Sequence, residues 1–168
     1  MLCLAGCAGL PPEGAGTGVV PPRPPLQQVT SFALLGRIAV QHGESSYSAR
    51  VSWRHEPARD AILVSSPLGQ GIAEVVRDAG GARLTLADRR EFAAADWEEL
   101  SERVFGVRLP LADLPRWVLG DVAGNAAGWQ VEVLQREDSP ANPLPTLLEL
   151  RREDTAVRLK IDEWSEVR

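Results

Sequence analysis

Apolar and polar residues alternate along most of this chain from residue 34 onward. The clearest example is 47–54, where Tyr47, Ala49, Val51 and Trp53 fall on one side and serine and arginine residues fall on the other. Successive side chains of a β-strand point to opposite faces, so this pattern predicts a strand with one buried and one solvated face. The same pattern predicts further strands at 34–42, 59–65, 71–77, 82–87, 91–94, 128–136, 147–152 and 156–164.

Two central segments have the spacing of amphipathic helices instead. The segment 96–105 begins with Asp96, and Glu99 three positions later completes the sequence of a capping box. The segment 111–119 carries Pro115, which a helix tolerates only near its first turn. The strands follow one another too closely for crossover helices, which favours antiparallel pairing. The predicted fold class is therefore α+β, with about eight or nine strands in one curved antiparallel sheet and helices on its concave side.

One predicted loop, 65–71, carries an apolar residue where a polar one is usual. Pro67 fixes φ and Gly69 permits a positive φ, so the segment reads as a turn between two strands. Its central residue is Leu68. The local sequence leaves two possibilities open: Leu68 folds back onto the core, or the loop presents it to a partner.

Composition and charge narrow the class of protein. With 44% hydrophobic and 24% charged residues, the 168-residue chain is typical of one globular domain with a non-globular extension. The net charge of -5, with arginines interspersed among acids, argues against a nucleic-acid binder. Both cysteines, Cys3 and Cys7, lie at the N-terminus, so the folded part has no disulfide and no cysteine metal ligand.

The N-terminal segment Leu4-Ala5-Gly6-Cys7 resembles the lipobox of bacterial lipoproteins, which implies that Cys7 is acylated. Only six residues precede Cys7, so we expect residues 1–6 to be the remainder of a longer signal peptide. Residues 7–25, rich in Gly and Pro, predict a semi-rigid tether, and residues 26–168 a single folded domain. Ala8, in place of an aspartate, favours the outer membrane over the inner membrane.

Catalytic chemistry is not predicted. The two histidines, His42 and His55, end neighbouring strands without a nucleophile motif or paired carboxylates nearby in the sequence, so we expect solvated strand ends. No metal ligands or cofactor motif are recognised. The prediction is a protein that is not an enzyme and that has no metal and no cofactor.

The order of several short motifs is similar to that of the LolB family of outer-membrane lipoprotein receptors, over about residues 32–164. The motifs are Gly36-Arg37-Ile38-Ala39-Val40, a strand ending in Trp53, Ser66-Pro67-Leu68-Gly69, Leu109-Pro110-Leu111, Trp117-Val118-Leu119-Gly120, Gly128-Trp129, Leu144-Pro145 and Ile161-Asp162-Glu163-Trp164. The chain departs from the family in its missing signal peptide and in a shorter segment before Phe32. Whether a helix precedes the first strand is therefore left undecided by the sequence.

The resemblance implies a half-open antiparallel β-barrel with helices covering its concave apolar side. It further implies a monomer, lipid-anchored in the outer membrane and facing the periplasm, that accepts lipoproteins from a LolA-type carrier. Their acyl chains are held in a hydrophobic cavity and then placed in the inner leaflet of the outer membrane. Pro67, Leu68 and Gly69 match the loop that touches this membrane. The candidate cavity residues are Ile38, Val40, Val51, Trp53, Leu84, Leu86, Trp117, Val118, Val131, Leu148, Leu150 and Leu159.

Two alternatives stay open from the sequence alone. The same apolar residues would serve equally well in a solid core, as in a structural or adaptor lipoprotein. A periplasmic hydrolase would need a nucleophile or a second histidine beside His42 or His55 in the folded chain.

Overall fold

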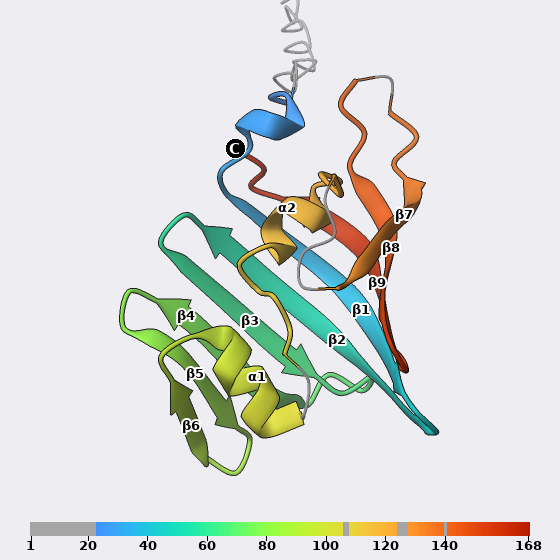
Figure 1. The fold of residues 1–168 in the computed structure, drawn as a ribbon. Helices are drawn as coiled ribbons and strands as arrows, with labels where there is room; N and C mark the ends of the chain where they lie inside the picture. Colours follow the sequence, from blue (N-terminus) through green and yellow to red (C-terminus); the bar gives the residue numbers. More distant parts are fainter. Residues whose placement is uncertain (1–22, 106–107, 124–127, 140) are drawn as a thin grey trace, which may run out of the picture.

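The computed structural model describes residues 23–105, 108–123, 128–139 and 141–168 (Figure 1). The predicted signal peptide, most of the tether and Cys7 lie outside these residues. Nine strands form a single sheet in the order β6-β5-β4-β3-β2-β1-β9-β8-β7, and every neighbouring pair is antiparallel. The strands are β1 (Phe32–His42), β2 (Ser45–Glu56), β3 (Arg59–Ser65), β4 (Gly71–Asp78), β5 (Gly81–Leu86), β6 (Glu91–Ala94), β7 (Gln130–Arg136), β8 (Pro145–Arg152) and β9 (Thr155–Ser165).

The sheet has one apolar face, which we call the covered face because the helices pack on it. Strand β1 begins two residues before the predicted 34–42, and along it the buried residues Phe32 and Leu34 alternate with the more exposed Ala33 and Leu35. The ring of Phe32 makes edge contacts with Trp53 on β2 and Trp164 on β9, at centroid distances of 5.1 and 5.4 Å. The opposite side, which we call the open face, carries most of the charged strand residues. The predicted α+β fold, an open curved sheet with helices, is confirmed at this level.

Two α-helices, α1 (Trp97–Phe105) and α2 (Leu114–Val118), supply core residues to the covered face. The predicted cap of α1 is present: the Glu99 amide donates to the Asp96 carboxylate at 2.8 Å. In a capping box the Glu99 carboxylate would accept from the amide of Asp96 itself. Here it accepts from the amide of the preceding residue, Ala95, at 3.3 Å. Helix α2 is shorter than the predicted 111–119. It begins at Leu114, so that Pro115 lies in its first turn, where a missing N–H does no harm.

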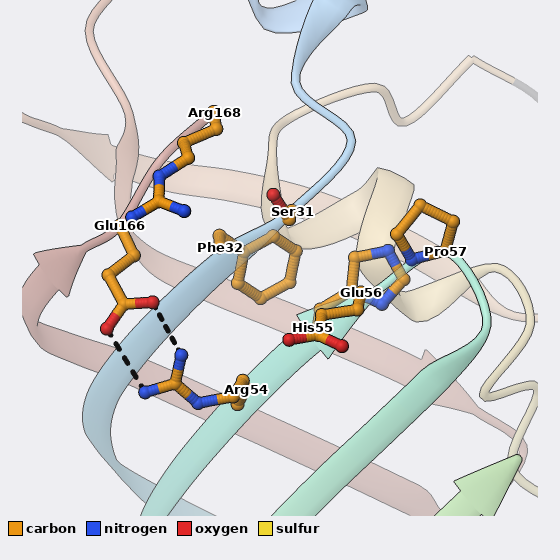
Figure 2. A pocket seen from close by; sticks show the side chains of 8 residues that line it. All are labelled: Ser31, Phe32, Arg54, His55, Glu56, Pro57, Glu166 and Arg168. Atoms are coloured by element: carbon orange, nitrogen blue, oxygen red, sulfur yellow. Dashed lines mark hydrogen bonds and ion pairs between the residues drawn. The ribbon is translucent and has the colours of Figure 1, made fainter.

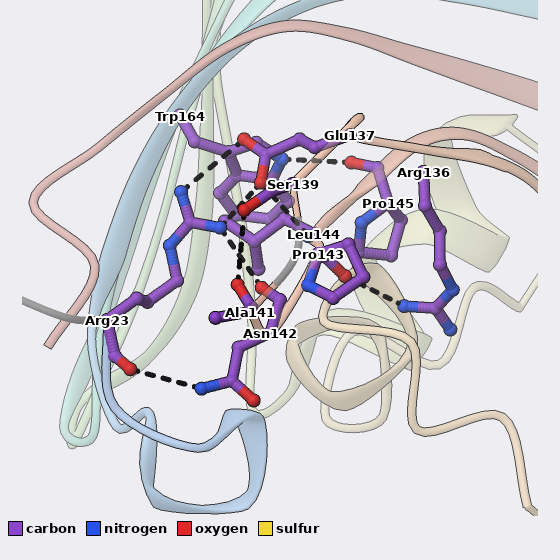
Figure 3. Close-up of polar contacts among 10 residues, drawn as sticks. All are labelled: Arg23, Arg136, Glu137, Ser139, Ala141, Asn142, Pro143, Leu144, Pro145 and Trp164. Atoms are coloured by element: carbon purple, nitrogen blue, oxygen red, sulfur yellow. Dashed lines mark hydrogen bonds and ion pairs between the residues drawn. The ribbon is translucent and has the colours of Figure 1, made fainter.

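Arg23, the first residue that the structure describes, docks on the β7–β8 connection (Figure 3). Its guanidinium donates to the Glu137 carboxylate at 2.5 Å, and the Asn142 amide donates to the Arg23 carbonyl oxygen at 3.1 Å. Burial works to raise the pKa of Glu137, but the bonds from Arg23 and the Leu144 amide outweigh it and lower that pKa. Next along the chain is a short 3₁₀ turn, η1 (Leu26–Gln28). The described chain therefore enters the domain beside the connection between β7 and β8.

Strands β1 and β9 approach unusually closely at Gly36. The register between them shifts at Leu35/Gly36, and a Cβ added at Gly36 would lie 2.5 Å from the Lys160 carbonyl oxygen. Gly36 is therefore required by the close approach of two backbones rather than by its φ angle.

Gly36→Ala should lower the free energy of unfolding by about 1–3 kcal/mol, because the backbone of β9 must move to admit the methyl group. Gly71→Ala is the matched control, since nothing lies within 4 Å of an added Cβ there. Urea unfolding followed by tryptophan fluorescence measures both. Equal effects of the two substitutions would contradict the role assigned to Gly36.

Candidate functional site

The loop between β3 and β4 presents Leu68 to solvent. The Leu68 side chain is 92% exposed, the highest value among the large exposed apolar residues. The Ser66 amide donates to the Gln70 carbonyl at 2.7 Å, and the Gly69 amide donates to the Ser66 carbonyl at 2.8 Å, so the loop is closed by its own backbone. Gly69 adopts φ of 88°, which favours glycine. Of the two possibilities left open by the sequence, the structure has the presented leucine; its contact with a membrane stays a prediction.

The predicted cavity residues all lie on the covered face or on α2. Seven of them are buried: Val51, Trp53, Leu84, Trp117, Val118, Leu148 and Leu150. Four more are partly buried against the same cluster: Ile38, Leu86, Val131 and Leu159. They come from six strands of the sheet and from α2, so one continuous apolar surface crosses the sheet. Their contact with acyl chains stays a prediction.

Val40 is the one candidate outside this cluster. It pairs in register with Tyr47 on the projecting β1–β2 hairpin, and Tyr47 is 67% exposed although its alternation places it on the covered face. The last residue of β3 before the β3–β4 loop is Ser65, which pairs with Arg50 on β2. The part of β2 from Ser45 to Ala49 therefore extends beyond the point where β3 ends. The β3–β4 loop and the β1–β2 hairpin therefore lie toward the same end of the sheet (Figure 1). The exposed residues Leu68 and Tyr47 belong to these two segments.

Two pockets on the surface are polar, and none of the candidate cavity residues lines either of them. One has a volume of about 230 Å³ and is lined by Ser31, Phe32, Arg54, His55, Glu56, Pro57, Glu166 and Arg168 (Figure 2). The other, of about 190 Å³, lies beside the β8–β9 turn. In this conformation the apolar residues of the covered face pack against one another and against the helices.

A buried carboxylate, Asp60 on β3, lies at the edge of the apolar cluster with no exposed surface. It accepts hydrogen bonds from the Trp53 indole at 2.9 Å and from Nε of Arg77 at 2.7 Å, and its Oδ1 lies 2.7 Å from Nδ1 of His55. Burial alone would raise the pKa of Asp60, but the bonds from His55, Trp53 and Arg77 together lower it. The prediction that both histidines are solvated strand ends is therefore wrong for His55, whose side chain is 14% exposed. Sequence spacing could not show it, because Asp60 and Arg77 come from two other strands.

No nucleophile is bonded to His55 among the described residues, and the hydroxyl and carboxylate beside His42 both face its Nδ1, so they do not form a relay through the ring. Ser31 lines the same pocket as His55, but no hydrogen bond joins its hydroxyl to the imidazole within the described part of the chain (Figure 2). His42 is half exposed and lies 2.8 Å from the Thr155 hydroxyl, with Asp154 at 3.4 Å. Across residues 23–105, 108–123, 128–139 and 141–168, no group of three or more His, Cys, Asp or Glu residues could hold a metal ion.

None of the helices in the described ranges is long and apolar enough to cross a membrane. The structure therefore has two defining features. Helices cover the apolar face of an open antiparallel sheet, and a loop between two strands presents a leucine to solvent.

Comparison with known proteins identifies the family. The family model for "Outer membrane lipoprotein LolB" matches residues 30–127. The chain is 36% identical to the outer-membrane lipoprotein LolB of Azoarcus sp. (strain BH72), covering 83% of this chain and 81% of that protein. It is 35% identical to the LolB of Nitrosomonas europaea, covering 98% of this chain and 88% of that protein. The chain therefore belongs to the LolB family, whose members are lipoprotein receptors of the outer membrane rather than a known family of enzymes.

Asp60→Asn should lower the free energy of unfolding by about 2–4 kcal/mol near neutral pH, because it leaves the Arg77 charge without its partner. The pKa of Asp60 in the folded protein lies below its ordinary value of 3.8, so the stabilisation is present above that pH and is lost as the pH falls below it. Urea unfolding at about pH 7 and at about pH 2 measures the change.

The control for this prediction is Asp121→Asn, which breaks the solvent-exposed ion pair with Arg116. That pair should contribute less than about 1 kcal/mol at either pH. A difference between wild type and Asp60→Asn that stays constant from neutral to acid pH would contradict the account of the Asp60 network.

Proposed function

We propose that this chain accepts lipoproteins from a LolA-type periplasmic carrier, holds their acyl chains between the helices and the covered face, and releases them into the inner leaflet of the outer membrane. The observation that carries the proposal is the continuous apolar surface of the covered face, which includes eleven of the twelve candidate residues. Acyl chains contribute about 0.8 kcal/mol per buried CH₂, so three chains cost on the order of tens of kcal/mol to expose to water. A receptor therefore needs an apolar surface on this scale, and the family needs no covalent chemistry to use it.

The proposed cavity opens where α2 covers the sheet. A helix of five residues is marginal by itself, so the position of α2 depends on the packing of Trp117 and Val118. An acyl chain entering between α2 and the sheet replaces one apolar contact with another of similar chemistry. In this proposal the domain is a half-open barrel with β6 and β7 as its two edges, and the helices on its concave side are the movable part.

Two buried donors, one at the start of α1 and one directly before β7, support a ligand with polar atoms. The indole N–H groups of Trp97 and Trp129 are buried without a hydrogen-bond partner among the described residues. A buried donor without a partner costs about 1–3 kcal/mol. The acyl groups of a lipoprotein are attached through ester and amide carbonyls, which are hydrogen-bond acceptors of the kind these donors lack.

Leu68 is the proposed membrane contact. Burying one leucine contributes roughly 1.5–3 kcal/mol, which is too little to anchor a protein but enough for a transient contact with the bilayer. The lipid anchor at Cys7, if acylated as its lipobox implies, keeps a monomeric domain beside the bilayer, and the tether gives it reach. Release then needs no energy source, because the bilayer is the more favourable environment for the acyl chains.

Leu68→Glu should leave acceptance of a lipoprotein from a loaded carrier largely unchanged and reduce its release into vesicles by roughly tenfold or more, since a carboxylate resists entry into an apolar layer. Acceptance and release are measured separately by mixing the purified components and then adding vesicles. Leu134→Glu is the matched control, a 38% exposed leucine on β7 outside the loop. Normal release by Leu68→Glu would remove the loop from the mechanism.

The rival function, an adaptor lipoprotein with a solid core, differs in one measurable property. Our proposal predicts that the chain takes up a fluorescent fatty acid at one saturable site and that Val118→Asp weakens this uptake, since Val118 is 1% exposed within the apolar cluster. Circular dichroism reports whether the variant folds, and Leu134→Asp serves as its surface control. A folded wild-type protein without saturable uptake would favour the adaptor.

A further inference from the structure

The open face of the sheet carries a row of three cations beside the Leu68 loop. Arg50 on β2 pairs in register with Arg37 on β1, and Arg37 pairs with Lys160 on β9. Arg50 also pairs with Ser65, the last residue of β3 before the loop. Neighbouring strands are about 4.8 Å apart, so the cation row starts one strand from the base of the loop and continues away from it. All three side chains are exposed.

The sequence gives no sign of this row. Arg50 lies 13 positions and Lys160 lies 123 positions after Arg37 in the sequence. The chain as a whole has a net charge of -5. The absence of a basic stripe in the sequence is therefore no guide to the folded surface, where antiparallel register places these residues side by side.

Three cations side by side on neighbouring strands reduce the stability of the folded sheet. Like charges directly opposite each other on neighbouring strands are destabilising. One carboxylate offsets the row: Asp162 accepts from Nε and Nη2 of Arg37 at 2.9 and 2.8 Å. The hydrogen bond from Arg37 is the main reason that the pKa of Asp162 is lowered, and the charges of Lys160 and Arg50 add to it. Within the described residues, no carboxylate forms an ion pair with Arg50 or Lys160.

Apolar side chains continue the same surface. Leu35 and Leu63 lie one step along the sheet from the cation row, on either side of Ser52 in the register, and they are 47% and 46% exposed. Ile72, which follows the loop on β4, is 43% exposed. A surface that combines exposed leucines with basic residues is typical of proteins that lie against a membrane interface. The helices pack on the other face, so the described part of the chain leaves this one uncovered.

We propose that the cation row Arg50–Arg37–Lys160 binds the headgroups of anionic phospholipids and so orients the domain on the outer membrane when Leu68 touches it. This inference rests on the proposed membrane contact of Leu68. Of the three cations, Arg50 lies nearest to the base of the loop, and anionic headgroups attract basic residues over a Debye length of about 8 Å. The leucine then supplies contact with the apolar layer, and the row supplies orientation and a preference for anionic lipid.

The test uses the full chain with Cys7→Ala, so that an acyl anchor does not mask weak binding. Flotation measures its partition onto neutral vesicles of phosphatidylcholine and phosphatidylethanolamine, and onto vesicles in which part of that lipid is phosphatidylglycerol. Wild type should prefer the anionic vesicles, and added salt should reduce the preference. Arg50→Gln with Lys160→Gln should lower partition onto anionic vesicles by roughly 25-fold, since each basic residue near such a surface contributes about a factor of five.

Arg59→Gln with Arg83→Gln is the matched control. It removes the same charge from two exposed arginines near the other ends of β3 and β5. It should leave the preference for anionic vesicles nearly unchanged. The double variant of the cation row should also be at least as stable in urea as wild type, because neutral residues relieve the repulsion across the strands.

Three outcomes would overturn the inference: an unchanged preference in the cation-row variant, an equal loss in the control, or a loss confined to acceptance from the carrier. The last would assign the row to an acidic protein surface. Release of lipoprotein into neutral vesicles reports on Leu68 and the covered face separately. A failure there with an intact anionic preference would count against the proposed function and not against the row.

Discussion

The apolar surface of the covered face is the constraint on which the rest of this structure depends. Nine antiparallel strands place their apolar alternate residues on one side, and that side must be kept from water. Helices α1 and α2 cover it, with Trp97, Leu100, Trp117 and Val118 as the buried contacts. The close approach at Gly36 and the buried Asp60 network hold the strands beneath this cover in place. The proposed acyl-chain site uses this same surface.

The polar features are placed where they do not interrupt this surface. Asp60, His55 and Arg77 meet at one edge of the cluster, and Trp53 is held there by its indole hydrogen bond. The docking of Arg23 on the β7–β8 connection fixes where the N-terminal segment joins the domain. The Leu68 loop lies between β3 and β4, in the other half of the sheet. The N-terminal segment and Leu68 are thus positioned by two different loops.

Much of the fold follows from local sequence. Alternation predicted the strands because each has one buried face, and the cap of α1 followed from Asp96 and Glu99. Helix α2 was predicted too long, because apolar spacing continues through the turn at 111–113 that precedes it. The environment of His55 and the row of Arg50, Arg37 and Lys160 could not be predicted, because both depend on register between distant segments. The cavity is a different case: a solid core and an acyl-chain site use the same apolar residues, so no sequence pattern separates them.

The most direct test of the account is to ask whether acyl chains enter between the helices and the covered face. A lipoprotein whose acyl chains carry bromine can be transferred from its carrier to this chain, because bromine quenches tryptophan fluorescence only at close range. The account predicts strong quenching of the buried tryptophans, reduced when Trp53 and Trp117 are replaced by phenylalanine. Stable transfer of the lipoprotein without quenching would place the acyl chains elsewhere and contradict the account.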